Sequence, residues 1–230
     1  MIPGIILALI EVLFIFTGGY YIRKNTNLQN INPVIYYWLI LTVFTGLFWE
    51  TAFVLQYKET NKYSQYLILN DETVWTNHYT LDYLLPWKFS KIFYGDYGAY
   101  ADREYMETYS DWSRVIESTH AIFCGLFALI SLCFHFKSNY REFLLTLGVS
   151  MGSQLMNSIL YMVEYFVQVE DPFNINYDTP EFPTGFLLSK RPFMWVNIFW
   201  TILPAYSIIY YLTNYQRNLQ TFTKTFKFVD

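Results

Sequence analysis

The sequence has few charged residues and almost no cysteine, and each shortage excludes a class of protein. Only 15% of its 230 residues are charged, against roughly 25% in a typical soluble domain. Lysine and arginine total 15 and aspartate and glutamate 19, so the net charge is −4. There is no basic stripe of the kind that binds nucleic acid. Cys124 and Cys133 are the two cysteines and lie in one apolar run, which excludes a disulfide-stabilised scaffold.

Hydrophobic residues, by contrast, make up 53% of the chain, and aromatic residues make up 22%. Tyrosine occurs 22 times, phenylalanine 21 times and tryptophan 7 times. So many large apolar side chains exclude intrinsic disorder, because they gain too much from burial to stay solvated. We therefore expect a protein whose surroundings are partly lipid.

Five segments have the length of about 20 mainly apolar residues that a helix needs to cross a bilayer. The connection 58–110 is long, and we expect it to lie outside the membrane, with the aromatic stretch Leu81–Phe93 at the interface. The sequence thus predicts an all-α polytopic membrane protein, a bundle of five transmembrane helices. The five segments run from Ile2 to Ile22, Pro33 to Tyr57, about Asp111 to Phe136, Tyr140 to Phe166, and Leu187 to Tyr215.

The domain organisation follows from these segments. Residues 1–32 form an N-terminal transmembrane helix and a short basic loop, and residues 33–215 form a membrane domain of four helices that includes the loop 58–110. Residues 216–230 form a C-terminal tail. Gly148 and Gly152, four residues apart, indicate close packing of a helix against a neighbour.

Polar side chains within the spans are rare, and each is a functional hypothesis because a polar group in lipid is costly. Glu50 shares a helical stripe with Thr42 and Gly46, and Glu117 lies one turn before His120. A buried carboxylate can carry a proton, and a glutamate–histidine pair can transfer one. Each group would equally serve as a hydrogen-bonding partner for a neighbouring helix. The ligands are too few for a metal site.

The deepest polar residues come from different spans and have aromatic neighbours. Glu50 follows Trp49, and Asn197 shares a helix face with Trp200, while Asn157 lies on the fourth span. A mostly apolar pocket with a few converging polar groups is typical of a site for a lipid-like molecule. Carboxylates and aromatic faces would also stabilise a carbocation formed there.

Four short motifs occur in order along residues 33–210. They resemble those of the emopamil-binding-protein family, the sterol Δ8–Δ7 isomerases with the EXPERA domain. The motifs are Phe48-Trp49-Glu50 followed by Phe53-Val54-Leu55, Ile116-Glu117-Ser118 before Gly125, Val149-Ser150-Met151-Gly152 with Asn157, and Asn197-Ile198-Phe199-Trp200 before Pro204.

The resemblance implies a five-helix EXPERA-like bundle whose members move a ring double bond of a sterol without a cofactor. Glu50 and Glu117 would then handle the proton. The family has a histidine where this chain has Gly46, and His120 would substitute for it from the facing helix. The pocket residues would be Asn197, Trp200, Trp49 and Asn157.

Three functions stay open at this point. We expect an EXPERA-fold protein that binds a sterol or another lipid within the membrane and whose catalysis is altered or lost. One alternative is an active sterol isomerase of the endoplasmic reticulum. The other is a non-catalytic subunit of a larger membrane complex, for which the mitochondrial inner membrane is the expected location. The chain would associate as a homodimer or as part of a larger membrane protein assembly. No metal, cofactor or nucleic-acid partner is expected.

Overall fold

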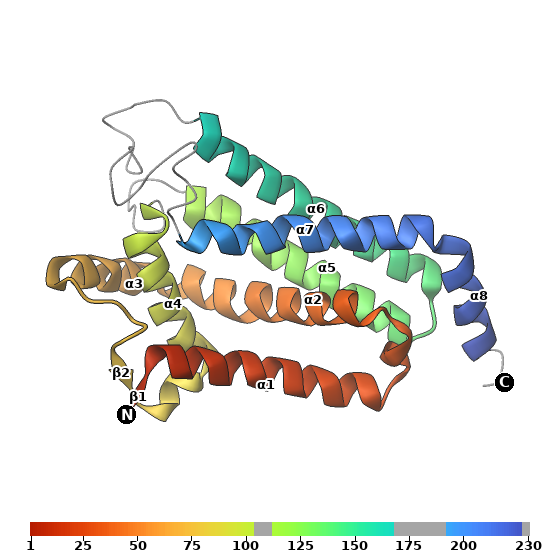
Figure 1. The fold of residues 1–230 in the computed structure, drawn as a ribbon, viewed down its shortest axis with the longest axis horizontal. Coiled ribbons are helices and arrows are strands. Elements are labelled where there is room, and N and C mark those ends of the chain that lie inside the picture. Colours follow the sequence, from red (N-terminus) through yellow and green to blue (C-terminus); the bar gives the residue numbers. More distant parts are fainter. Residues whose placement is uncertain (104–111, 168–191, 227–230) are drawn as a thin grey trace.

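A computed structural model describes residues 1–103, 112–167 and 192–226, and these residues are almost entirely helical (Figure 1). The expected starts of the third and fifth spans, Asp111 and Leu187, lie outside them. Eight α-helices are described, namely α1 (Gly4–Lys24), α2 (Pro33–Phe44), α3 (Thr51–Asn70), α4 (Pro86–Tyr100), α5 (Ser118–Phe136), α6 (Tyr140–Val167), α7 (Pro192–Thr213) and α8 (Tyr215–Phe226).

Shorter elements connect or interrupt these helices. Two 3-10 turns are described, η1 (Asn27–Asn30) and η3 (Leu81–Leu84), together with two π-helical turns, η2 (Thr45–Glu50) and η5 (Trp112–Glu117). The strands β1 (Ile2–Pro3) and β2 (His78–Tyr79) form one short antiparallel pair.

Five helical segments of the described chain are long and apolar enough to cross a membrane, which agrees with the number predicted. In Figure 1 α1, α2, α5, α6 and α7 run along the long axis of the molecule, and α4 lies across one end of them. The five segments are Gly4–Lys24, Pro33–Asn70, Arg114–Phe136, Tyr140–Val163 and Trp195–Thr213.

The second segment is longer than predicted. A loop was predicted from residue 58, and this is wrong, because the helix continues through α3 to Asn70, with a local break at Gln56. Its 38 residues would extend for about 57 Å at 1.5 Å per residue, roughly twice the thickness of the hydrocarbon layer. The added turns are stabilised because Leu67 is fully buried and α3 packs along α4.

The predicted tail 216–230 also contains regular structure. Helix α8 follows α7 after a single turn residue at Asn214 and turns away from the bundle axis (Figure 1). Its first residue, Tyr215, stacks loosely on Tyr140 with 6.3 Å between the ring centroids, and Leu219 packs against the core. The end of the tail, residues 227–230, lies outside the described part of the chain.

Two buried clusters hold the fold together. One lies inside the bundle, where Leu39 of α2 and Ala128 of α5 pack with Phe143 and Met151 of α6. The other joins α1 to the elements that cover the end of the bundle, and its members include Leu7, Trp49, Phe53, Leu67 and Phe89. Apolar burial is the main favourable term in both.

Asp96 fastens the covering elements together. Its buried carboxylate accepts hydrogen bonds from the Thr73 hydroxyl at 2.9 Å, the Val74 backbone N–H at 3.0 Å and the Trp75 indole N–H at 2.8 Å. Three donors satisfy a carboxylate that would otherwise be costly to bury. The loop after α3 is therefore held against α4.

We refer to residues 58–103, which hold the end of α3, β2, η3 and α4, as the cap.

Candidate functional site

The described helices line a partly open cavity of about 160 Å³ at the level of the π-helical turns. A single water needs only roughly 10–15 Å³ by the same kind of measure, so the cavity has room for an organic molecule. All seven residues that the sequence analysis proposed for the site lie in its wall. They are Glu50, Glu117, His120, Asn197, Trp200, Trp49 and Asn157.

Both cavity carboxylates stand at the ends of π-helical turns. Turn η2 ends at Glu50, and turn η5 ends at Glu117. A π-helical turn holds an extra residue, so it re-aims the side chains that follow it, and such turns often occur at functional sites. The two turns thus set the directions of the two acids.

Glu50 is buried and has hydroxyl donors on two neighbouring elements. The Tyr94 hydroxyl of α4 donates a hydrogen bond to its Oε1, and the Ser118 hydroxyl of α5 also reaches the carboxylate. Burial and the adjacent Glu50 hold the pKa of Tyr94 well above its usual value. Tyr94 therefore keeps its proton and serves as a donor to Glu50.

A second set of polar contacts links the cavity to the end of α4. The Tyr97 and Tyr161 hydroxyls are 2.8 Å apart, and Tyr161 donates to Asp102 at 2.9 Å. Tyr97 also contacts the Asn197 side chain and lies within electrostatic reach of Glu117. Because Tyr161 gives its proton to Asp102, Tyr97 is the donor to Tyr161. These contacts fix the orientation of the Tyr97 and Tyr161 hydroxyl groups in the cavity wall.

His120 lies in the cavity wall and is held by α6. Its Nε2 is 3.0 Å from both the backbone oxygen and the hydroxyl of Ser153, and 3.4 Å from the sulfur of Cys124. A carbonyl oxygen only accepts, so Nε2 carries hydrogen in this arrangement. The imidazole therefore hydrogen-bonds to a neighbouring helix. This is the structural role that the sequence left open for His120 beside proton transfer.

Gly46 does not face the cavity with Thr42 and Glu50, although α-helical spacing predicted one stripe for the three. Instead it packs against α5, where an added Cβ would overlap the Ala121 carbonyl oxygen and lie 3.1 Å from the Cα of Gly125. Gly125 in turn lies close to the backbones of both Thr42 and Gly46, and most of the π-helical turn falls between Gly46 and Glu50, where α-helical spacing does not hold. No side chain fits between the two backbones at this point.

Aromatic rings form much of the remaining wall. Trp49 packs on Phe89 and Phe93, with centroid distances of 5.0 and 5.5 Å. Trp200 meets Trp38 edge to face at 5.0 Å, and the Trp38 indole N–H donates to Gln154 at 2.8 Å. The ring contacts restrict the two cavity tryptophans, so their faces are already oriented for a ligand.

Helix α4 contributes to the cavity, which the sequence did not predict. Phe93, Tyr94 and Tyr97 line the cavity, yet all three belong to a segment that was assigned to an extramembrane loop. The excess of aromatic residues in Leu81–Phe93 was the one available signal, and it was attributed to the membrane interface. Tyr161, on α6, was also left out of the predicted site.

Among the described residues that line the cavity there is no lysine and no arginine. Its acidic groups are two carboxylates, with one imidazole and several hydroxyls and amides around them. Comparison with known proteins gives no further identification, since the chain matches no protein-family model, no curated protein and no solved structure. The fold and the site define a helical protein with five candidate membrane spans and an acidic, aromatic-walled internal cavity.

Proposed function

We propose that this protein binds a sterol or another apolar lipid in the cavity between its membrane helices, and that its catalysis is altered or lost relative to sterol isomerases. One observation carries the proposal. Seven residues chosen from the sequence as a lipid site, spread over the second to fifth spans, line a single cavity. The resemblance to the emopamil-binding-protein family supports the choice of a sterol, and from it we infer the endoplasmic reticulum as the membrane.

The wall of the cavity suits such a ligand. Flat rings from Trp49, Phe93 and Trp200 offer apolar faces, and the carboxylates and Asn197 offer a few polar positions. A ligand with a fused apolar ring system and one hydroxyl would bury its rings on the aromatic wall and direct the hydroxyl to a polar group. Polar groups placed in this way fix the orientation of the ligand and provide specificity.

The position of Gly46 supports the loss or alteration of catalysis. The family histidine would stand there, but the position is filled by the contact between two backbones. His120 reaches the cavity from α5, yet its Nε2 is committed to Ser153. A proton relay through the family position is therefore replaced by a packing contact.

The direct test is to identify what the protein carries. We expect organic extraction of the full chain, purified in mild detergent, to release about one sterol or similar lipid per protein, above the amount from an unrelated membrane protein prepared in parallel. A filled-cavity variant, Thr45→Phe, should retain less of that lipid at unchanged yield. Equal amounts in both proteins would contradict the proposal.

An active isomerase is the second candidate, and the pair of cavity carboxylates favours it. One acid would protonate a ring double bond and the other would accept a proton from a neighbouring carbon. The test is incubation of the purified protein with a Δ8-sterol, followed by analysis for the Δ7-sterol. Conversion that disappears in Glu117→Gln would establish this candidate, and absence of conversion with bound sterol would support the binding protein.

A further inference from the structure

Three large apolar side chains are exposed at the tip of the cap, where η3 leads into α4. Leu81 is 67% exposed, Leu85 39% and Trp87 49%. The aromatic residues further along α4 do not face outward, because Phe89 is buried and Phe93 lines the cavity. The expectation of an interfacial stretch therefore narrows to the residues around Leu81–Lys88, which we call the tip.

The tip is fastened to the beginning of the first candidate span. Ile2 pairs with Tyr79 in the short sheet, and the Gly4 backbone N–H donates to the Asn77 oxygen at 2.9 Å. Element η3 also contacts α1. Gly4 permits this close approach, since a Cβ there would overlap the Val74 carbonyl oxygen.

The length of α1 locates the membrane boundary. Its 21 residues extend for about 31 Å, which matches a hydrocarbon layer of roughly 30 Å. Arg23 and Lys24 occupy its last turn, and basic residues mark the end of a span. The first turn of α1, to which the tip is tied, therefore lies at the opposite boundary.

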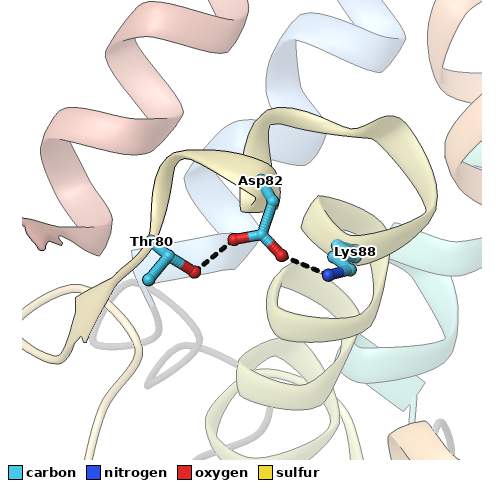
Figure 2. A network of polar contacts seen from close by, with 3 residues as sticks. All are labelled: Thr80, Asp82 and Lys88. Atoms are coloured by element: carbon cyan, nitrogen blue, oxygen red, sulfur yellow. Dashed lines mark hydrogen bonds and ion pairs between the residues drawn. The ribbon is translucent and has the colours of Figure 1, made fainter.

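The charges of the tip neutralise one another. The Asp82 carboxylate accepts from the Thr80 hydroxyl and pairs with the Lys88 ammonium, as Figure 2 shows. Lys88 holds the pKa of Asp82 below its usual value, so the pair stays ionised but has no net charge. Lys88 also lies 5.6 Å from the ring centroid of Tyr83. A tryptophan, a tyrosine and a lysine with a long apolar stem are the side chains that favour a lipid–water interface.

We propose that the tip is a membrane anchor, in which Leu81, Leu85 and Trp87 enter the interfacial layer of the leaflet nearest the first turn of α1. The anchor holds one end of α4, which supplies cavity residues from its other turns. The partner is the lipid interface itself. This inference depends on the membrane spans and not on the ligand of the cavity.

Spin labels on the full chain in lipid nanodiscs test this proposal. In a Cys124→Ala, Cys133→Ser background, nitroxides are placed by Leu81→Cys and by Leu85→Cys. Two reference sites bracket them, Phe14→Cys in α1 (72% exposed) and Leu69→Cys at the end of α3 (84% exposed). The measured quantity is the ratio of collision rates with oxygen and with a water-soluble nickel chelate.

We expect the ratio at Leu81 and Leu85 to be several-fold above that at Leu69 and below that at Phe14. A ratio equal to that at Leu69 would overturn the proposal, because the tip would be in water. Low accessibility to both reagents would also overturn it, in favour of a protein contact.

Tryptophan quenching provides a check without added labels. The difference in emission between the unmodified protein and Trp87→Phe isolates Trp87. Lipids brominated near the headgroup should quench this difference signal several-fold more than lipids brominated at the chain ends. No quenching by either lipid would contradict the anchor.

Discussion

The Tyr94 hydroxyl donates a hydrogen bond to the Glu50 carboxylate, and this contact joins α4 of the cap to the end of η2 in the bundle. The same two elements meet again where the Ser90 hydroxyl donates to the Trp49 backbone oxygen at 2.7 Å. The cap is therefore part of the cavity and not an independent loop. Its removal would expose two faces that now bury each other.

Tyr94→Phe should destabilise the protein by about 1–3 kcal/mol, because a buried carboxylate loses a donor while the ring remains in place. The measurement is the midpoint of thermal unfolding in detergent. Tyr21→Phe is the matched control, since Tyr21 is exposed on α1, and it should change stability by less than about 0.5 kcal/mol. Equal midpoints for the two variants would show that the contact with Glu50 contributes nothing.

Gly46→Ala should lower stability by about 1–3 kcal/mol, because the new methyl group would force η2 and α5 apart. Gly148→Ala is the control, since a Cβ at Gly148 meets nothing within 4 Å and alanine favours a helix by about 1 kcal/mol over glycine. The two substitutions should therefore shift the unfolding midpoint in opposite directions. A shift of the same sign and size in both would refute the packing role of Gly46.

A sterol analogue that carries an ammonium group should bind more tightly than its neutral counterpart, because the described residues around Glu50 and Glu117 in the cavity wall include no lysine or arginine. Glu50→Gln should reduce that preference by at least about tenfold, or ~1.4 kcal/mol. Competition against a fluorescent sterol gives both affinities. Glu142→Gln, in the first turn of α6, should leave the preference unchanged, and an equal loss there would argue against a cavity effect.

Asp96→Ala should loosen the loop between α3 and α4, because three donors that now meet its carboxylate would lose their partner at about 1–3 kcal/mol each. Brief chymotrypsin treatment, which cuts after residues such as Trp75 and Tyr79, measures the opening. Cleavage in this loop should accelerate several-fold. Glu59→Ala removes only an exposed 3.6 Å ion pair between Glu59 of α3 and Lys91 of α4, which contributes little to stability, so it should leave cleavage nearly unchanged. Undisturbed cleavage in Asp96→Ala would show that the cap is held by its aromatic core alone.

Apolar length made the spans predictable, because the cost of burying backbone in lipid leaves helices as the natural solution for runs of about 20 apolar residues. The same reasoning identified polar residues of the cavity. Glu50, Glu117 and Asn197 are conspicuous in the sequence because polar groups are so rare within apolar segments. The structure brings all three to one cavity.

What the sequence did not predict depends on contacts between distant residues. Tyr94 and Tyr97 belong to a segment without a long apolar run, and only its packing against α3 and η2 brings them to the cavity. Gly148 and Gly152 were expected at a close helix contact and have open space instead, while Gly46 and Gly125 form one. A π-helical turn also has no signal in a pattern read at 3.6 residues per turn.

Photocrosslinking with a sterol that carries a diazirine on its ring system tests the central claim most directly. After irradiation of the full chain in nanodiscs, mass spectrometry of its peptides locates the adducts. We expect adducts in the cavity wall, in the peptides that hold Glu50, His120 and Trp200, and we expect excess unlabelled sterol to suppress them. Adducts confined to outward-facing positions such as Phe14 and Leu145, or adducts that excess sterol does not reduce, would contradict a sterol site inside the bundle.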